Sequence, residues 1–439
     1  MSIAAADAET IGRRAVSRAA WRIVPFLMLL YFVSFLDRVN VGFAGLTMNK
    51  DLGFSSEVFG FGGGLFFFGY FLLEVPSNLM LHKLGARVWI ARIMITWSVF
   101  SAANAFVTTP LSFYVVRFLL GMAEAGFFPG IILYLSYWFP ARKRAAMIGL
   151  FMAAAPMSLA LGSPVSAWLM QLHGLWGLAG WQWMFLLEAL PALVLGFVVL
   201  FVLSDRPEQA RWLPDDERAW LVETLRREEA EAAPRAHHSI WKGLSDWRVL
   251  LLCFAYFGTA AGLYVVGIWG PLFLQQFGLT IIQIGWLNLI PGGVAMVLMI
   301  LWGWSSDRTG ERYWHTAIAC LVSAAGLFYG GVAASVAGAL LALTLVQVGI
   351  NATKGPIWSI PTLFLSGPAA ATGIATINSV GNIGGFVGPY MVGYLKDLTG
   401  SYAGGLYFTG ATLVVSAVLI VLLGGWMKKS ALAEAARGQ

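Results

Sequence analysis

Segment 31–48 (YFVSFLDRVNVGFAGLTM) is apolar enough to enter a bilayer, yet it contains Asp37, Arg38 and Asn40. On insertion scales, each charge near the middle of a membrane costs roughly 2.5–3.5 kcal/mol. Two adjacent charges therefore need partners, a water-lined cavity, or both. Ionisable residues at such positions commonly mark substrate or proton pathways. The alternative is an ion pair that only holds two helices together.

A second pair of charges, Arg117 and Glu124, lies in another apolar segment, seven residues apart. Two helical turns place both side chains on one face but about 10 Å apart along the axis, so neither satisfies the other. Consecutive helical residues point about 100° apart. We therefore expect a crossed arrangement, in which Asp37 pairs with Arg117 and Arg38 pairs with Glu124.

These four charges form a candidate proton switch. Protonation of Asp37 or Glu124 would free an arginine, and a guanidinium binds a carboxylate through two parallel hydrogen bonds, which a lysine cannot do. A substrate anion that displaces the arginine would in turn favour protonation of the acid. Asp37 and Glu124 are thus predicted to couple protons, and Arg38 and Arg117 to attract an anion. Static bracing is the alternative.

Segment 351–361 (NATKGPIWSIP) contains Gly355, Pro356 and Pro361, which predict a broken helix. Non-helical backbone at membrane depth is tolerated only where it faces protein or a cavity. Lys354 in this segment is either a further cation, for a second carboxylate or a ring acid, or a side chain that extends to the membrane surface.

Tyr70 lies in the aromatic run FFFGYF and is either a hydroxyl donor to substrate or a packing residue. Glu74 follows one turn later, and we expect it to be structural, capping the loop after its helix. Asn378 and Asn382 stand one turn apart in a glycine-rich segment. Those glycines indicate close helix packing.

The composition is that of a protein with many membrane spans. Of the 439 residues, 59% are hydrophobic and 11% charged, against about 25% charged in soluble chains. Mean hydropathy is +0.74. Long continuous apolar runs exclude a membrane β-barrel, whose strands would be short and alternating. Cys253 and Cys320 lie in apolar runs without metal-ligand spacing, so we interpret them as small core residues.

Spans of about 20 residues divide the chain into twelve transmembrane helices, arranged as two six-helix bundles. The predicted helices cover residues 21–47, 58–81, 88–107, 111–138, 144–171, 182–203, 249–275, 284–304, 314–334, 337–364, 370–395 and 403–426. The fold class is therefore an all-α membrane protein. The domains are expected at 1–203 and 248–439, with a linker at 204–247.

Basic residues orient these helices. Of the 28 Lys and Arg, only Lys50 and Lys396 fall on the side opposite the termini, and Arg38, Arg117 and Lys354 lie within spans. Cytoplasmic loops carry the excess of Lys and Arg, so both termini are predicted to be cytoplasmic. The net charge of +6 follows from these loops and indicates no nucleic-acid partner.

The linker contains an amphipathic pattern. Segment 213–233 starts with acidic residues, which favour a helix N-terminus, and has Trp220, Leu221 and Leu225 at helical spacing. We expect a short helix on the cytoplasmic face. The adjacent His237 and His238 lack a carboxylate or cysteine partner, so we interpret them as linker residues rather than a metal site.

The two halves of the sequence echo each other at an offset of 225 residues. Segment 78–87 (NLMLHKLGAR) corresponds to 303–312 (GWSSDRTGER), and the matching positions are Lys83 with Arg308, Gly85 with Gly310 and Arg87 with Arg312. Outside these segments, Pro164 matches Pro389 at the same offset. Two parallel half-repeats with a substrate site between them, near the midplane, are a common transporter plan.

The chain resembles the major facilitator superfamily. The superfamily loop pattern is intact at Gly303, Asp307, Arg308, Gly310 and Arg312, and it is degraded in the first half at Asn78 and His82. Four segments resemble the anion:cation symporter family within it, which contains phthalate, tartrate, hexuronate, galactonate and nicotinate permeases. These segments are FLDRVNVGFA at 35–44, EVPSNLMLHKLGARVWIARIMITW at 74–97, RFLLGMAEAGFFPGIILYLSYWFP at 117–140 and INSVGNIGGFVGPYMVGYLKDLTGSY at 377–402.

The resemblance implies uptake of a small organic anion together with protons, by rocking of two halves. It assigns the acids of the charge set to proton coupling and Arg38 to substrate binding. It also assigns substrate-facing positions to Tyr70, Trp358, Ser359 and Asn382, with Asn378 as a further candidate, and gating to the loop motif that includes Arg87. Glu188 resembles a structural landmark that ties its helix to the cytoplasmic loops.

We therefore expect a proton-coupled importer of a small carboxylate, such as tartrate, phthalate or a sugar acid, in the inner membrane. The expected partners are that anion, protons and the lipid bilayer. No phosphate-binding loop of the GxxxxGK[ST] type is present, and no enzyme, cofactor or metal is expected. The alternative is an exporter or drug-type proton antiporter of the same fold.

Overall fold

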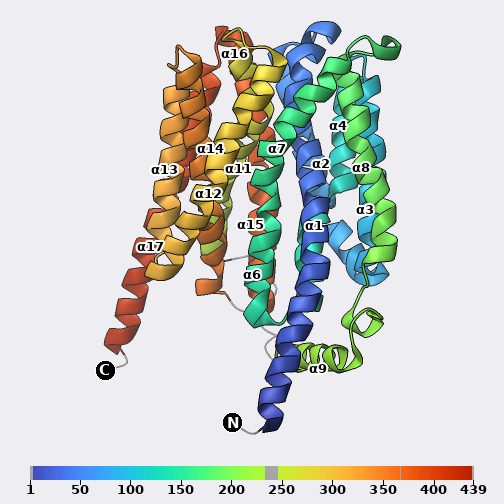
Figure 1. The fold of residues 1–439 in the computed structure, drawn as a ribbon. Helices are drawn as coiled ribbons and strands as arrows, with labels where there is room; N and C mark the ends of the chain where they lie inside the picture. Colours follow the sequence, from blue (N-terminus) through green and yellow to red (C-terminus); the bar gives the residue numbers. More distant parts are fainter. Residues whose placement is uncertain (1–2, 233–245, 366, 438–439) are drawn as a thin grey trace.

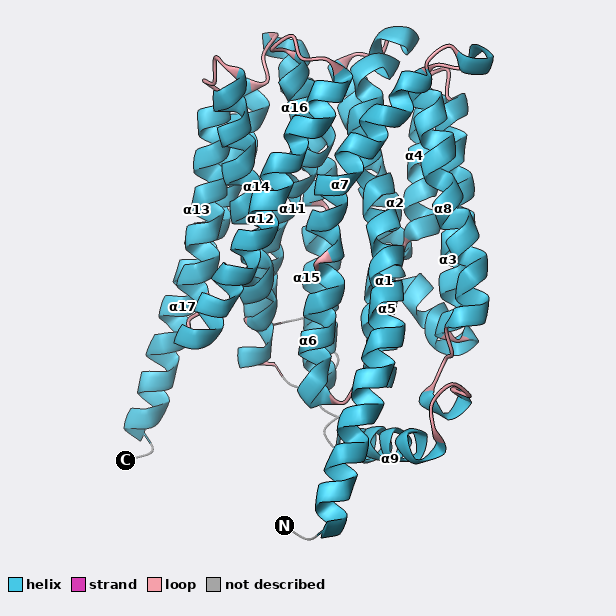
Figure 2. Ribbon diagram, viewed as in Figure 1, coloured by secondary structure: helices cyan, strands magenta, loops and turns pink. Residues whose placement is uncertain are grey.

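A computed structural model describes residues 3–232, 246–365 and 367–437. Helices connected by short loops make up this part of the chain, and it contains no strand (Figure 2). In the first half the helices are α1 (Ile3–Leu52), α2 (Ser56–Leu84), α3 (Ala86–Ala103), α4 (Pro110–Glu124), α5 (Phe127–Trp138), α6 (Ala141–Met152), α7 (Ala154–Leu169) and α8 (Gly180–Val202). In the rest they are α9 (Asp215–Ala232), α11 (Trp247–Gln275), α12 (Ile281–Thr309), α13 (Tyr313–Gly330), α14 (Val336–Ser359), α15 (Gly367–Gly381), α16 (Gly384–Thr399) and α17 (Ala403–Arg437).

The predicted all-α membrane fold is confirmed. Within the described ranges, ten helical segments are long and apolar enough to cross a membrane. Helix α13 and the consecutive pair α15 and α16 occupy the positions of the other two predicted spans. A twelve-span fold therefore fits the chain.

Three of the predicted spans are interrupted. The fourth consists of α4 and α5, separated at Gly126, whose φ of +84° belongs to the left-handed region. The fifth consists of α6 and α7, and the eleventh of α15 and α16. The first interruption matters for function because it directly follows Glu124.

The helix break predicted in segment 351–361 is wrong at Gly355 and Pro356 and is confirmed before Pro361. Helix α14 continues through Gly355 and Pro356 and ends at Ser359. A proline inside a membrane helix is tolerated because neighbouring groups satisfy the freed backbone carbonyl. Pro361 instead starts a short 3-10 turn after the helix.

Helices from the two sequence halves pack against each other in pairs. Helix α2 lies against α16, α7 against α12, and α1 against α11. At Gly60 an added Cβ would lie 2.5 Å from the carbonyl oxygen of Pro389 in the other half, and at Gly384 it would lie 2.2 Å from that of Phe257, within the second half. Only glycine permits such an approach, so the predicted close packing of the Gly-rich segment is confirmed.

The internal repeat is visible in the helix bounds. Helices α2 and α12 have equal lengths of 29 residues and start 225 residues apart. Each is followed by a glycine with positive φ, Gly85 at +90° and Gly310 at +67°. The matched glycines therefore turn the chain at the same place in each half.

The amphipathic helix predicted in the linker is present as α9, which packs on the start of α1. Arg18 donates to both carboxylate oxygens of Glu217, at 2.9 and 3.2 Å. Trp212 stacks on Trp138. The predicted linker segment with His237 and His238 lies outside the described residues.

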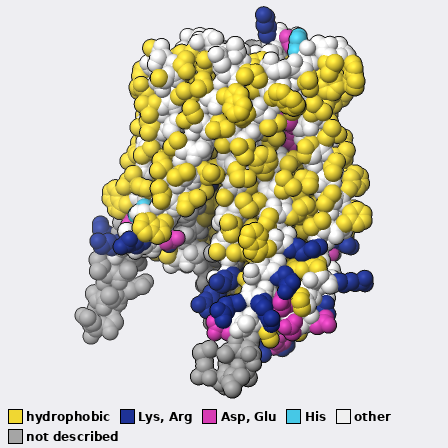
Figure 3. Space-filling model, viewed as in Figure 1, with side chains coloured by type: hydrophobic (Ala, Val, Ile, Leu, Met, Phe, Trp, Pro, Cys, Tyr) yellow, Lys and Arg dark blue, Asp and Glu magenta, His cyan; other side chains and the backbone are white. Residues whose placement is uncertain are grey.

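The start of α1 and the end of α17 lie at the same end of the molecule, where α9 packs beside α1 (Figure 1). The visible surface carries a broad apolar belt, and most of its Lys and Arg side chains gather below that belt, toward the termini (Figure 3). Exposed aromatic and aliphatic side chains such as Phe201, Phe254 and Trp286 contribute to the apolar surface. This distribution suits a protein embedded in a bilayer.

Candidate functional site

Helix α1 carries a row of buried polar residues at its middle. Ser34, Asp37, Arg38 and Asn40 are each at most 5% exposed. The Nε atom of Arg38 donates to Oε1 of Glu124 at 2.7 Å, and Ser34 Oγ donates to the same oxygen at 2.6 Å. The structure thus contains the predicted contact between Arg38 and Glu124.

Glu124 is the last residue of α4, directly before the interruption at Ala125 and Gly126. It is completely buried, and its Oε2 atom has no hydrogen-bond partner among the described residues. The helix break therefore places a carboxylate, with one acceptor position free, beside the guanidinium of Arg38.

The predicted contact between Asp37 and Arg117 is wrong. Asp37 instead accepts hydrogen bonds from Trp97 Nε1 and Ser101 Oγ of α3, both at 2.8 Å, and from Asn40 Nδ2 at 3.3 Å. Because Asp37 points about 100° away from Arg38 around α1, it faces α3, which supplies neutral donors. Trp97 and Ser101 stand one turn apart in the sequence. Both side chains are neutral, so nothing in the sequence distinguished them as partners of an acid.

Arg117 is completely buried and lies against an aromatic ring. Its guanidinium carbon is 5.3 Å from the ring centroid of Phe66, and its Nη2 atom donates to the carbonyl of Gly63 at 3.4 Å. Its Nε and Nη1 atoms have no hydrogen-bond partner among the described residues. The ring of Phe66 also contacts Arg38, at 5.7 Å, so it is shared by the two arginines.

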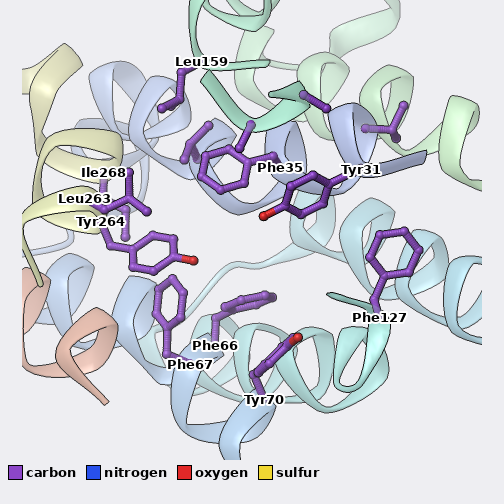
Figure 4. Close-up of a cluster of buried hydrophobic side chains, with 14 of the residues drawn as sticks. Tyr31, Phe35, Phe66, Phe67, Tyr70, Phe127, Leu159, Leu263, Tyr264 and Ile268 are labelled. Atoms are coloured by element: carbon purple, nitrogen blue, oxygen red, sulfur yellow. The ribbon is translucent and has the colours of Figure 1, made fainter. Parts of the chain in front are cut away.

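A narrow cavity of about 50 Å³ lies between the two halves. The residues that line it are Tyr31, Phe35, Arg38, Tyr70, Phe128, Met152, Tyr256, Thr259, Ala260, Leu263, Tyr264, Ile350, Thr353, Lys354, Trp358, Asn378 and Asn382. The hydroxyl groups of Tyr31, Tyr70 and Tyr264 point toward a common space (Figure 4).

Most of the predicted substrate-facing residues line this cavity. They are Arg38, Tyr70, Lys354, Trp358, Asn378 and Asn382. Two predicted residues are not on its wall. Arg117 is enclosed by Phe66 and the backbone of α2, and Ser359 donates to the carbonyl of Gly355 at 3.0 Å at the end of its own helix.

Several residues of the second half that line the cavity were not predicted from the sequence. Tyr264 of α11 accepts a hydrogen bond from Arg38 Nη1 at 3.2 Å, which links the two halves directly. Tyr256, on the same helix, packs on Trp358 with ring centroids 4.8 Å apart. Tyr256 and Tyr264 stand two turns apart on one helix, and this spacing was the feature of the sequence that could have indicated a polar face toward the cavity.

Two further acids have partners that the sequence did not predict. Glu74 accepts hydrogen bonds from Asn378 Nδ2 and Ser379 Oγ of α15, both at 2.6 Å, so it connects the halves rather than capping its own loop. Glu188 accepts from Ser166 Oγ at 2.7 Å and from Asn40 Nδ2 at 3.0 Å. It lies inside the first half because it sits in the middle of α8, remote from the loops.

The loop motif is compact in the second half. Asp307 Oδ1 lies 2.6 Å from Arg312 Nη2, and Arg312 also donates to Ser306 Oγ at 2.8 Å. In the first half, where an acid is missing from the motif, Asp205 accepts from the backbone N–H of Arg87 at 2.8 Å. Each loop therefore keeps a carboxylate at the start of the next helix, although from a different sequence position.

A model of the Major Facilitator Superfamily matches residues 27–389. This chain belongs to the major facilitator superfamily. Together with the transporter names of its relatives, the match shows a multi-pass membrane transporter rather than an enzyme.

Relatives of this superfamily member carry different substrate names. A protein of Agrobacterium vitis, named as a candidate tartrate transporter, is 63% identical over 410 residues, which cover 93% of this chain and 91% of the relative. A protein of Acinetobacter baumannii named quinolone resistance transporter is 39% identical over 409 residues, covering 93% and 94%. The relative with the tartrate name is consistent with the anion-permease branch that the sequence motifs resemble.

A solved structure supports the fold alone. The crystal structure of a bacterial homologue of the human lysosomal transporter Spinster, in an inward-facing and occupied conformation, has a TM-score of 0.73 to this chain. The two sequences are 16% identical, and the match covers 92% of this chain and 96% of that one. The superfamily fold is therefore retained at low sequence identity.

Proposed function

We propose that this transporter takes up a small organic carboxylate together with protons, by alternating access of its two halves, in the bacterial inner membrane. The single observation that carries the proposal is the environment of Arg38. Its Nε atom contacts Glu124, its Nη1 atom contacts Tyr264, and its Nη2 atom has no partner among the described residues. This guanidinium lines the cavity between the halves.

The free Nη2 atom gives a carboxylate its first contact. A guanidinium binds a carboxylate best through two parallel N–H donors, so full binding requires Arg38 to turn away from Glu124 or Tyr264. Substrate and Glu124 thus compete for one cation. A buried carboxylate that loses its cation is costly, so protonation of Glu124 would accompany substrate binding.

Asp37 has a different place in the proposed cycle from the one its sequence suggested. Its neutral donors Trp97 and Ser101 belong to α3 of the same half. It is one residue from Arg38, so a change in its charge would act on the guanidinium through space. We therefore keep Asp37 as a second proton-coupling residue, behind Glu124, which contacts the cation directly.

The proposed moving bodies are residues 1–203 and 248–439, connected by the linker at 204–247. The loop motif with Gly303, Asp307, Arg308, Gly310 and Arg312, and its counterpart at Arg87, would hold the cytoplasmic ends of the helices during the movement. The gathering of Lys and Arg near the termini supports a cytoplasmic placement of both ends (Figure 3).

The relative named as a candidate tartrate transporter supports a carboxylate substrate, and tartrate is the first compound to test. The protein should be reconstituted in liposomes and given labelled tartrate, phthalate or a sugar acid, with an inward proton gradient. Accumulation above the external concentration, abolished by a protonophore, is the expected result. Uptake that is unaffected by the gradient would contradict proton coupling.

The second candidate is an exporter or drug-type proton antiporter. It is favoured by the relative named quinolone resistance transporter. The same liposomes separate the two functions, because an antiporter would move a labelled quinolone against the direction of proton flow and would leave tartrate outside. The cationic wall provided by Arg38 and Lys354 supports the anion importer instead.

A further inference from the structure

The cavity contains two cationic side chains, one from each half of the molecule. Arg38 belongs to α1 and Lys354 to α14. Glu124 balances the charge of Arg38 from behind the cavity wall. No aspartate or glutamate is among the described residues that line the cavity.

Lys354 is partly buried and has only a neutral anchor. Its Nζ atom donates to Asn351 Oδ1 at 2.8 Å, one turn back on the same helix. Asn351 is fixed in turn, because its Nδ2 atom donates to the backbone carbonyl of Gln347 at 2.8 Å. Within the described residues, no carboxylate lies within ion-pair distance of the ammonium group. The lysine is therefore held at the cavity wall with its charge uncompensated.

We propose that the site is built for a dicarboxylate, with one carboxylate on Arg38 and the second on Lys354. This inference rests on the proposed carboxylate transport and narrows its substrate class. A charge at membrane depth is costly unless it is paired, so an anionic group that reaches Lys354 gains more than a neutral one. A monocarboxylate bound to Arg38 leaves the ammonium group unpaired, whereas a diacid neutralises both cations.

Neutral donors and acceptors between the cations suit a hydroxylated or flat diacid. Tyr70, Asn378 and Asn382 line the same cavity and can bind hydroxyl groups or ring edges. Because the two cations belong to opposite halves, a bound diacid connects α1 with α14. A bound diacid thereby favours approach of the two halves. A monoacid binds the cation of one half only and does not connect them in this way.

The test compares each diacid with its own monoamide, since the amide has the same size and lacks one charge. Wild-type protein in liposomes should take up tartrate, phthalate or succinate at least tenfold faster, at low concentration, than tartramate, phthalamate or succinamate. Lys354→Met should abolish that preference by slowing the diacid at least tenfold. Lys354→Arg should restore the preference. Lys50→Met, at an exposed lysine at the end of α1, is the matched control and should behave as wild type.

The outcomes distinguish this inference from the function on which it rests. If the wild type transports carboxylates but treats each diacid and its monoamide alike, the dicarboxylate site is overturned and carboxylate transport stands. The same holds if Lys354→Met keeps the preference. If the wild type transports no carboxylate of either kind, the proposed function itself is overturned. The wild-type comparison remains decisive even if a Lys354 variant fails to fold.

Discussion

Glu74 of α2 accepts a hydrogen bond of 2.6 Å from Asn378 Nδ2 of α15, a residue that also lines the cavity. The neighbouring Ser379 Oγ donates to the other carboxylate oxygen at the same distance. Glu74 is 3% exposed and follows Tyr70, another cavity residue, by one turn. A carboxylate of the first half is thus held by the second half immediately beside the proposed substrate site.

Removal of this contact is expected to release the two halves. In Glu74→Ala, Asn378 and Ser379 lose their acceptors, at a cost of about 1–3 kcal/mol for each buried group left unsatisfied. The state in which α2 and α15 are joined should therefore lose population at least about fivefold. Spin labels at the exposed Leu84 and Leu363 report the distance between the halves, and the native Cys253 and Cys320 are buried and should escape labelling.

A matched control is available one turn away. Asn78 Nδ2 donates to the backbone carbonyl of Glu74 at 2.8 Å, so Asn78→Ala leaves the carboxylate and its partners intact. Its distance distribution should match that of the wild type. If Glu74→Ala also matches the wild type, the contact does not determine how the halves are joined.

Arg38→Lys is expected to raise the KM for the carboxylate about 10- to 100-fold. The variant keeps the charge but loses the planar set of donors that now reaches Glu124 and Tyr264 and leaves Nη2 free. Hydrogen bonds to charged groups contribute about 1.5–3 kcal/mol. Initial uptake rates over a concentration series measure the effect. Arg13→Lys, at an exposed arginine, controls for the exchange of residue type, and an unchanged KM in Arg38→Lys would remove Arg38 from the binding site.

Glu124→Gln is expected to separate proton coupling from substrate exchange. The glutamine keeps an oxygen for Ser34 and Arg38 but cannot gain or release a proton. Accumulation driven by a pH gradient should fall to the equilibrium level, while exchange of labelled for unlabelled substrate across the liposome membrane continues. Glu208→Gln, at an exposed acid in the linker, should accumulate substrate normally. Normal accumulation by Glu124→Gln would show that another group carries the proton.

The contact between α9 and α1 is expected to stabilise the protein without taking part in transport. Glu217 is 2% exposed and binds Arg18, whose own side chain is half exposed, so Glu217→Ala should cost about 1 kcal/mol. The thermal midpoint should fall by a few degrees, with uptake at 25 °C unchanged. Glu223→Ala is the control, because Glu223 pairs, among the described residues, only with Arg226 and Arg227 on the exposed face of the same helix. Equal midpoints for the two variants would contradict a bracing role for Glu217.

Much of the fold was predictable because apolar length and charge position are properties of the chain itself. A span needs about 20 apolar residues whatever its neighbours are, and the repeat offset that relates Gly85 to Gly310 reappears as a glycine with positive φ at the end of each matched helix. The contact of Arg38 with Glu124 was also predictable, since two isolated charges in a membrane have few possible partners.

Other features depended on which helix lies against which. The sequence by itself determined a twelve-span transporter of this superfamily, with its buried charges and its basic loops, because hydropathy and charge act along the chain. Only the tertiary structure decided that Asp37 faces Trp97 and Ser101, and that Glu74 reaches Asn378 in the other half. Neutral hydrogen-bond donors can satisfy the oxygens of a buried acid, and a sequence does not reveal them until packing brings them within about 3 Å.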